Sequence, residues 1–302
     1  MVALRLNEHG ALSCNMSSQQ TLETLRVLKF QETTSYQYHD YLAELPISTC
    51  YIDHWCRSKM IDWSFQIIDY IKFDRDTVIT ATSYLDRFLA AGSPRAKSAI
   101  QCRREYQLAA MTTLYMAIKL SKPSIVNIDI LVELSQGSFS PEEFTQMEMD
   151  ILFGLNWFLN GPTALTFLEL YDMLLSFNIN IACVAPDKLI NNARYQIELS
   201  VKNYNLLNYD PSTVAAAAII YSSKRMTHTS PSLMKHLEAI TGVNVHSANI
   251  RQILHIMHHC NKNPSLAVRN STSSRCPEIR RSGKSTFNES HSGSPKGISS
   301  DE

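Results

Sequence analysis

Apolar residues recur along most of this chain at intervals of three and four positions, the spacing of one face of an α-helix. Strict alternation of apolar and polar residues, which would indicate a half-buried β-strand, is hard to find, and the chain has only nine glycines. Several prolines follow a residue of the kind that caps helices, as in Ser140-Pro141-Glu142-Glu143, where we expect a helix to begin. The pattern therefore predicts an all-α protein of helices joined by short loops.

One long segment has no charged residue on any side. The 13 residues from Tyr106 to Ile118 are uncharged, so a helix formed by them should be surrounded by protein. Residues Leu108–Lys119 also align without gaps with Val214–Arg225, with small residues and a tyrosine in register. Two alanine-rich helices can match in this way by chance. If the match is an internal repeat, each copy is the central helix of its own small bundle.

Length and composition divide the chain into domains. Its 302 residues, 44% of them hydrophobic, are enough for two ordinary domains with separate cores. From Asn263 onward the sequence is rich in Ser, Asn, Arg, Lys and Gly and has almost no apolar periodicity, which cannot offset the entropy of ordering. We predict a partly disordered N-terminal extension over 1–35, helical domains over 36–160 and 161–262, and a disordered tail over 263–302.

Charge and cysteine content exclude several classes of protein. The 28 basic residues balance the 28 acidic ones, which argues against electrostatic binding of nucleic acid or a membrane surface. The seven cysteines are scattered and form no Cys-x-x-Cys pair, so we expect neither a disulfide framework nor a zinc ribbon. We expect the protein to reside in a reducing compartment. The longest apolar run, Val214–Tyr221, is far shorter than the ~20 residues of a membrane span, and no signal-peptide pattern begins the sequence. We expect a protein outside the membrane, with no cofactor.

A group of histidines near the end of the helical region raises the possibility of a metalloenzyme. His255, His258, His259 and Cys260 are spaced so that two histidines share one helix face. No third ligand or catalytic carboxylate accompanies them convincingly, so we favour a structural or solvated helix end and predict no bound metal.

Two charged residues fall on otherwise apolar helix faces. At about 100° per residue, Arg57 lies among Met60, Ile61 and Ile68, and Asp86 flanks the apolar stripe of the next helix. We predict an Arg57–Asp86 ion pair that joins the two helices. Removing one partner of such a buried pair costs about 3–5 kcal/mol. The alternative is that Arg57 extends along the surface to reach water.

A second pair of charges is placed in a similar way. Glu148 lies about 60° from the centre of the apolar stripe formed by Phe144, Met147 and Ile151. Lys119, the first charge after the long uncharged segment, is its natural companion. The two form either an ordinary surface salt bridge or a charged site that faces another protein.

These four residues lie in segments that resemble the successive signatures of the cyclin box. The segments are Arg57–Trp63, Tyr84–Leu89, Lys119, Met147–Glu148, Leu155–Trp157 and Pro162-Thr163, and their order and spacing both fit. A weaker resemblance continues through Asp210–Ala216, similar to the central helix of a second box, and ends near Lys262. The resemblance implies two tandem five-helix cyclin-box domains.

The resemblance also implies a regulatory role. Cyclins bind and activate a cyclin-dependent Ser/Thr protein kinase and are not enzymes, so no catalytic residue is expected. In the family, the counterparts of Arg57 and Asp86 form a structural salt bridge, and those of Lys119 and Glu148 contact the kinase.

Two further segments bear on the kinase and on the phase of the cell cycle. The segment around Tyr36–Leu42 is similar to the short N-terminal helix that also touches the kinase in this family. Residues Ser140–Glu148 most resemble D-type, G1-phase cyclins, which implies a role in cell-cycle progression at G1/S.

The cyclin surface that captures Arg-x-Leu docking motifs is only partly preserved. Met60, Trp63 and Gln107 fit the family pattern, whereas Cys56, Lys59 and Gln66 do not, because two apolar positions and one acidic position have changed. We expect weak or altered docking of kinase substrates or inhibitors that carry such motifs.

The tail carries short motifs of regulatory type. Ser294-Pro295-Lys296 is a minimal proline-directed phosphorylation site with Ser294 as the acceptor, and Arg280–Lys284 is a thin basic cluster. We therefore expect the protein in the nucleus and the cytoplasm. The alternative function is that of a cyclin-fold transcription-associated protein, which would bind nucleic acid or the transcription machinery. Because the neutral chain has no strongly basic face outside the tail, we predict no nucleic-acid partner.

Overall fold

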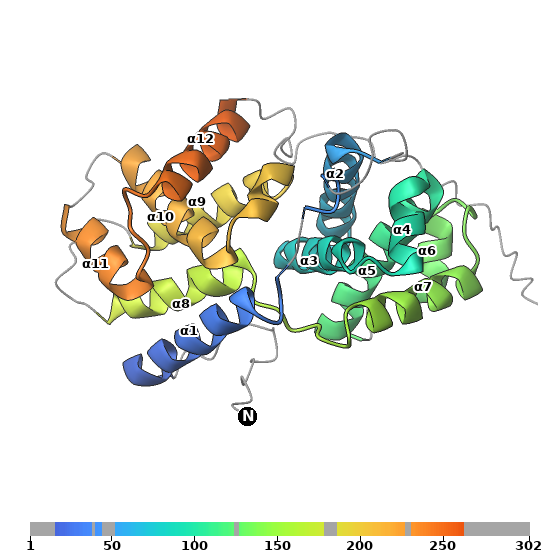
Figure 1. The fold of residues 1–302 in the computed structure, drawn as a ribbon, viewed down its shortest axis with the longest axis horizontal. Helices are drawn as coiled ribbons and strands as arrows, with labels where there is room; N and C mark the ends of the chain where they lie inside the picture. The colour runs from blue at the N-terminus through green and yellow to red at the C-terminus, as the bar shows by residue number, and fades with distance from the viewer. Residues whose placement is uncertain are drawn as a thin grey trace, which may run out of the picture. The chain divides into compact units, whose positions relative to one another are not determined.

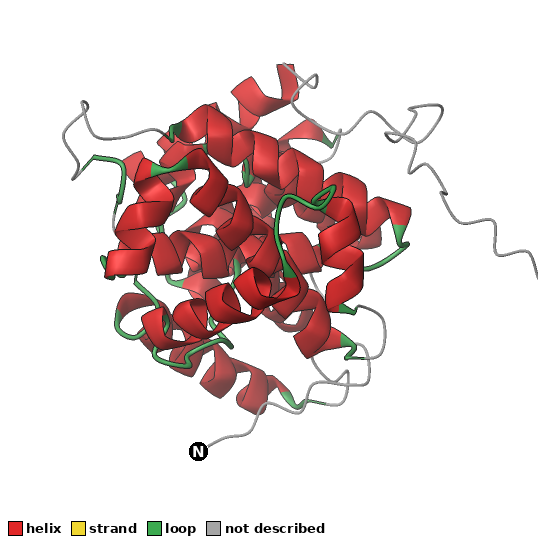
Figure 2. Cartoon of the chain, turned by 90° about the vertical axis from the view of Figure 1, so that its right-hand side faces the viewer, coloured by secondary structure: helices red, strands yellow, loops and turns green. Residues whose placement is uncertain are grey.

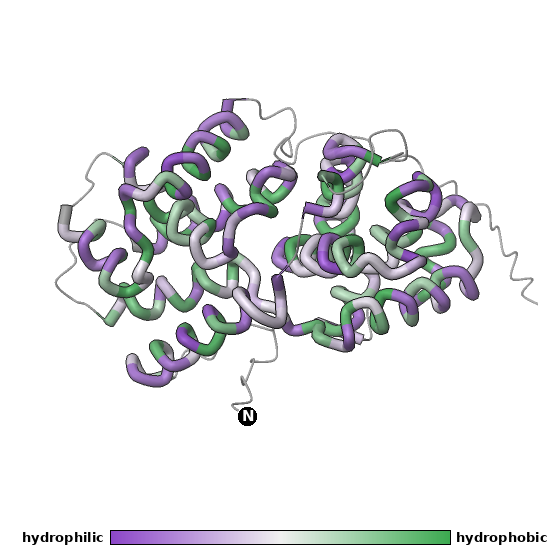
Figure 3. The backbone as a smooth tube through the Cα atoms, viewed as in Figure 1, coloured by the Kyte–Doolittle hydropathy of each residue, from purple (hydrophilic) through white to green (hydrophobic). Residues whose placement is uncertain are grey.

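The computed structural model describes residues 16–37, 40–43, 52–123, 127–177, 186–226 and 231–262. All of them belong to one compact unit that extends over residues 1–268. Within these ranges the chain forms twelve α-helices, one 3₁₀ turn and no strand (Figure 2). Most helices carry both hydrophilic and hydrophobic positions, as expected of helices with one buried face (Figure 3). The prediction of an all-α protein is confirmed.

The first helical group packs around α5 (Arg103–Ser121). Its other members are α2 (His54–Tyr70), α3 (Asp76–Ala90), the short α4 (Pro94–Gln101), α6 (Ile128–Leu134) and α7 (Pro141–Gly154). Helix α5 contacts α2, α3, α4 and α7, and every residue from Leu108 to Ile118 is buried. The uncharged segment is therefore a central helix, as its sequence predicted.

The second helical group repeats this arrangement around α10 (Pro211–Arg225). It contains α8 (Ala164–Ser176), α9 (Pro186–Ser200), the 3₁₀ turn η1 (Tyr204–Asn208), α11 (Pro231–Thr241) and α12 (Ala248–Lys262). Helix α10 lies among α8, α9, α11 and α12 and contacts each of them (Figure 1). Residues Val214–Ser223 of α10 are buried. The two aligned sequence segments thus occupy equivalent central positions in two bundles.

A helix near the N-terminus was not expected from the sequence. Helix α1 (Ser18–Thr33) begins with a capping box, in which Ser17 and Gln20 exchange side-chain and backbone hydrogen bonds. Leu25 and Leu28 of α1 are buried in the core of the second helical group, against α8 (Figure 1). The described part of 1–35 therefore includes a packed helix.

The segment Tyr36–Leu42, for which the resemblance implied a short helix, is not helical where the structure describes it. Residues 36, 41 and 42 lie in turns, and residues 37 and 40 are irregular. The helix lies earlier in the chain, at α1, because the Ser17 cap and the leucine spacing favour it there.

Charged and polar contacts join the two helical groups. Lys202, which follows α9, donates to Asp62 of α2 with 2.6 Å between Nζ and Oδ1. Arg75, just before α3, pairs with Glu198 of α9 at 2.8 Å. Arg194 of α9 binds carboxylates of both groups, on α3 and on α8. These ionic contacts add to apolar ones, because Val201 and Leu207 pack against the first core and Ile79 of α3 lies in the second.

Candidate protein-interaction site

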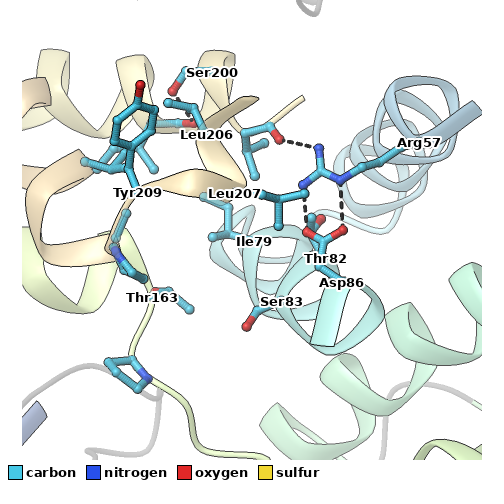
Figure 4. A pocket seen from close by; sticks show the side chains of 16 residues that line it. Arg57, Ile79, Thr82, Ser83, Asp86, Thr163, Ser200, Leu206, Leu207 and Tyr209 are labelled. Carbon is cyan, nitrogen blue, oxygen red and sulfur yellow. Dashed lines mark hydrogen bonds and ion pairs between the residues drawn. The ribbon is translucent and has the colours of Figure 1, made fainter. Parts of the chain in front are cut away.

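Arg57 of α2 and Asp86 of α3 form a buried, bidentate ion pair. Arg57 Nε and Nη2 lie 2.9 and 2.7 Å from the two Asp86 oxygens, and each side chain is 4% exposed (Figure 4). The third nitrogen, Nη1, donates to the carbonyl of Val201 at 2.9 Å. Arg57 therefore does not extend to water, and its guanidinium links α2, α3 and the second helical group.

The surroundings of Arg57 favour its charged form. Burial opposes the charge of Arg57, but the carboxylate of Asp86 outweighs it and holds the pKa of Arg57 above its ordinary value. The hydroxyl of Tyr41 donates to Asp86 Oδ1 at 3.0 Å, and burial raises the pKa of Tyr41 well above its usual range. Tyr41 therefore remains a neutral donor, and the pair has a structural role.

A cavity of about 80 Å³ lies beside the ion pair (Figure 4). Its walls come from α3, α9, η1 and the start of α10, and they include Ile79, Ser83, Ser200 and Leu207. Pockets for drug-sized ligands are several times larger, at about 300–1,000 Å³. We therefore assign this cavity to the packing between the helical groups.

Lys119 and Glu148 also lie together, at the end of α5 and in the middle of α7. Lys119 Nζ is 2.9 and 3.2 Å from the two Glu148 oxygens. The lysine side chain is 45% exposed and the glutamate side chain 18%. The hydrogen bond to Glu148 raises the pKa of Lys119, although burial opposes this. The structure therefore places a charged pair at the surface, beside the buried apolar stripe of α7.

Large apolar side chains are exposed in the same chain segments as this pair. Leu120 follows Lys119 in the chain, and Met149 follows Glu148; both are exposed. Phe153, one turn further along α7, is 62% exposed, and Trp157 is 58% exposed. The two rings lie edge to face with 6.1 Å between their centres. Exposed aromatic residues of this size, when grouped, mark surfaces that another protein covers.

The chain leaves α7 through an unusual turn that positions Trp157. Asn156 and Trp157 have φ angles of 50° and 62°, a left-handed conformation that is unfavourable for a residue with a large side chain. Gly154 is packed so closely on Phe88 that an added Cβ would lie 2.9 Å from its ring. The end of α7 is therefore tightly fixed while the tryptophan remains at the surface.

Sequence reasoning did not identify the exposed group Leu120, Met149, Phe153 and Trp157. A signal was present, because Met149 and Phe153 are one turn apart but fall outside the stripe of Phe144, Met147 and Ile151 that α7 buries.

The residues of the expected docking patch lie on two neighbouring helices. Cys56, Met60 and Trp63 are half-buried on α2, and Gln107 is exposed on α5, which packs against α2. Lys59 and Gln66, the changed positions, are exposed on α2. Whether this surface binds a peptide stays a prediction.

The remaining sequence expectations concern metals, membranes and the tail. In the described ranges, no group of three or more His, Cys, Asp or Glu side chains is arranged to hold a metal ion. None of the helices within those ranges combines the length and apolar character needed to cross a bilayer. Ser294 and the basic cluster at Arg280–Lys284 lie outside the described residues.

Two family models match the chain. Residues 23–160 match the cyclin N-terminal domain, and residues 162–285 match the cyclin C-terminal domain. The first match begins inside α1, so this helix belongs mostly to the matched region.

Among curated proteins, the chain is similar to plant cyclins. It is 30% identical over 207 residues to G2/mitotic-specific cyclin-2 of Antirrhinum majus, and the aligned region covers 68% of this chain and 42% of the relative. It is 28% identical over 163 residues to putative cyclin-A3-1 of Arabidopsis thaliana, and the aligned region covers 54% of this chain and 43% of the relative. The chain thus spans about four-tenths of the length of these relatives.

Among solved structures, a viral cyclin from herpesvirus saimiri has a similar fold. The TM-score is 0.57 with 18% sequence identity, and the superposition covers 78% of this chain and 97% of the viral protein. At this identity the likeness concerns the fold alone.

Proposed function

We propose that this chain, which belongs to the cyclin family, binds and activates a cyclin-dependent Ser/Thr protein kinase and so regulates the cell cycle. The observation that carries the proposal is the Lys119–Glu148 pair at the surface, in segments that also expose the side chains of Leu120, Phe153 and Trp157. The chain acts as a regulatory subunit and contributes no catalytic residue.

The chemistry of this surface suits a protein partner. Trp157 and Phe153 offer a large apolar area, and aromatic residues of this kind often carry most of the binding energy of an interface. A partner that covers both these rings and the Lys119–Glu148 pair removes water from the ion pair, which strengthens the interactions of the pair with polar groups of that partner. The apolar residues thus provide affinity, and Lys119 and Glu148 provide orientation.

Activation proceeds by a shift in the kinase population. The cyclin surface binds only the kinase conformation in which the regulatory helix is swung inward, and this completes the Lys–Glu pair and the metal site of the kinase. A rigid binding surface is required for this selection. The close packing of Gly154 on Phe88 and the buried Arg57–Asp86 pair supply that rigidity.

The test measures binding and activation together. The purified chain is titrated into each of several cyclin-dependent kinases, and phosphorylation of a Ser/Thr peptide is followed with and without it. We expect tight binding to at least one kinase and a large rise in its activity. Binding without activation would contradict the activating role, and failure to bind any of them would contradict the proposal as a whole.

We propose further that the chain acts at G1/S, on the basis of the D-type resemblance of Ser140–Glu148. The relatives named above bear A-type and G2/mitotic names, so the phase requires its own measurement. In synchronised cells, the level of the protein and its associated kinase activity should rise before DNA replication. A peak at mitosis would contradict this assignment.

We also propose that the protein is present in both the nucleus and the cytoplasm. The basic cluster Arg280–Lys284 supports import into the nucleus. A fluorescent fusion of the full chain should be found in both compartments, and removal of residues 263–302 should reduce the nuclear fraction. An unchanged distribution would contradict the role of the tail.

A further inference from the structure

Helix α12 carries a row of basic side chains on the side that faces solvent. The row, which we call the α12 stripe, consists of Arg251, His255, His258, His259 and Lys262, and all five are exposed. At about 100° per residue, four of them fall within about 60° of one another, and His259 lies at their edge. Ile253 and Met257, on the opposite side of α12, are buried in the second core. The stripe therefore points away from that core.

The side chains of the stripe have no partner of opposite charge. None of them makes a hydrogen bond or an ion pair within the part of the chain that the structure describes. The polar residues that flank the stripe are engaged elsewhere. Gln252 accepts a hydrogen bond from the hydroxyl of Tyr209 at 2.6 Å. Asn261 donates to Gln196 and to the carbonyl of Met257. The stripe is therefore free to bind a ligand.

Other charged helix faces of this chain are balanced by neighbouring elements. Glu143 of α7 pairs with Arg104 of α5 at 2.7 Å. Glu198 of α9, the helix that packs against α12, pairs with Arg75. Because acidic and basic residues are equal in number along the whole chain, a surface of one sign is a local arrangement and not a consequence of composition.

The stability of the helix explains only part of the stripe. Cations are favourable in the last turn of a helix, where His259 and Lys262 lie. Arg251 lies in the first turn, where the helix dipole disfavours a cation, and no acidic residue accompanies it there. Exposed helix faces often gain stability from opposite charges three or four positions apart, but α12 contains no Asp or Glu. The row as a whole therefore needs another explanation.

The spacing of the stripe matches that of an extended chain. Residues three or four apart on a helix have Cβ atoms about 5–6 Å apart, and alternate side chains of an extended chain recur about every 6.6 Å. From Arg251 to Lys262 the helix rises about 16 Å, which an extended segment of about six residues spans. The two end residues supply positive charge, and the imidazoles between them supply N–H donors. Carboxylates accept hydrogen bonds from all of these groups.

We propose that the α12 stripe binds an extended segment of a partner protein in which Asp or Glu occupies alternate positions. Carboxylates at the two ends of the segment pair with Arg251 and Lys262, and those between them accept hydrogen bonds from His255 and His258. Duplex DNA carries one charge per about 1.7 Å and would present about ten phosphates to a stripe with only two such cations. The stripe therefore suits a protein segment better than nucleic acid.

Fluorescence polarisation on the purified full chain tests the proposal. The first probe is a short fluorescein-labelled synthetic peptide in which Glu alternates with Ser or Gly, and the second probe has Gln in place of each Glu. The acidic peptide should bind at least ~10-fold more tightly, and its affinity should fall as salt is raised. Equal binding of the two peptides overturns the proposal, as does the absence of binding by both.

A matched pair of double substitutions locates the binding. Arg251→Gln with Lys262→Gln should weaken the acidic peptide by at least ~10-fold. Arg26→Gln with Lys235→Gln, at exposed positions on α1 and α11, removes the same charge and should not alter the affinity. Gln is a good helix former, so the circular dichroism of both variants should be unchanged. Equal effects of the two double substitutions would overturn the location, because the basic residues of the tail would then explain the binding.

The imidazoles and the class of partner are tested in the same assay. His255→Ala with His258→Ala keeps both end charges and should weaken the acidic peptide by at least ~5-fold, whereas His246→Ala, at an exposed position before α12, should not. Unchanged affinity would overturn the role of the histidines. A labelled oligothymidylate should lose no affinity in the Arg251 and Lys262 double variant. A loss as large as that of the peptide would overturn the choice of a protein partner.

This inference goes beyond the proposed function and is measured separately from it. Because no kinase is present in the binding assay, the peptide result does not depend on whether the chain activates one. Conversely, Arg251→Gln with Lys262→Gln should leave kinase activation intact, since α12 belongs to the second helical group and the proposed kinase surface is on α5 and α7.

Discussion

The carboxylate of Glu32 in α1 accepts a hydrogen bond from the backbone nitrogen of Ser212, 3.0 Å away at the start of α10. Asp210, the N-cap residue of α10, makes no side-chain cap hydrogen bond of its own. A residue from the N-terminal helix therefore supplies a cap for the central helix of the second cyclin box. In the same region Lys29 of α1 donates to the carbonyl of Thr241 at the end of α11.

Replacing this capping residue should destabilise the chain. Glu32→Ala leaves the buried Ser212 N–H without its partner, which costs about 1–3 kcal/mol. We expect an earlier midpoint in urea unfolding followed by circular dichroism. Glu23→Ala, at an exposed position of the same helix, serves as the control and should change little. Equal effects of the two substitutions would show that the loss comes from helix propensity.

The same residue should make stability depend on pH. Burial raises the pKa of Glu32 above its ordinary value, so the folded chain binds this proton more tightly than the unfolded chain. The contribution of Glu32 to stability is therefore largest at low pH and declines as pH rises from about 4.5 through the folded pKa. Glu32→Gln should abolish this decline. Unfolding free energies of wild type and Glu32→Gln, measured across this pH range, should converge at the acidic end.

The Arg57–Asp86 pair should tolerate substitution poorly. Arg57→Met leaves the carboxylate of Asp86 buried without its cation, which costs about 3–5 kcal/mol. The matched control is Arg104→Met, which breaks a pair with Glu143 at 2.7 Å on an exposed surface and should cost about 0–1 kcal/mol. Thermal unfolding distinguishes the two. A similar loss in both variants would contradict the structural role of the buried pair.

The Lys119–Glu148 pair should behave in the opposite way. Lys119→Ala and Glu148→Ala should each leave the unfolding midpoint nearly unchanged, because the pair is at the surface. Each should lower kinase activation by at least ~10-fold, since a charge that orients the kinase is lost. Lys235→Ala provides a control at a distant exposed lysine. Full activation by both variants would argue strongly against the proposed kinase surface.

Trp157 allows folding and binding to be separated at one residue. Its left-handed backbone suits glycine, so Trp157→Gly should keep the unfolding free energy or raise it by up to ~1 kcal/mol. The same change removes an exposed aromatic ring and should weaken kinase binding by at least ~10-fold. Tyr195→Gly would disturb a helix, so Tyr195→Ala in α9 is the better exposed control. Unchanged affinity in Trp157→Gly would place the kinase elsewhere.

The helices and the paired charges were accessible from sequence because they depend on local periodicity. Residues Tyr106–Ile118 carry no charge, and this alone predicts a central helix. Arg57 and Glu148 each interrupt an apolar helix face. A helical wheel therefore indicates that each needs a partner of opposite charge. The structure brings both to the partners named from sequence, whereas the role of Lys119 and Glu148 in kinase binding stays a prediction.

The features missed from sequence depend on distant or non-periodic contacts. Helix α1 buries few apolar residues, and the partners of Leu25 and Glu32 lie in the second helical group. No local sequence pattern predicts which distant residues Leu25 and Glu32 contact. The exposure of Phe153 and Trp157 was not predicted, and the turn that exposes Trp157 has no periodic signal. Exposure at the end of a helix is set by tertiary packing.

The position of α1 has a consequence for how the chain is made. During synthesis this helix leaves the ribosome before any residue of α8 or α10 exists. Its two buried leucines therefore have no packing partners until the whole first box has been translated. Contacts that span so much sequence slow folding, because a large loop must close before they form. Completion of the second box is thus delayed until the beginning and the later part of the polypeptide meet.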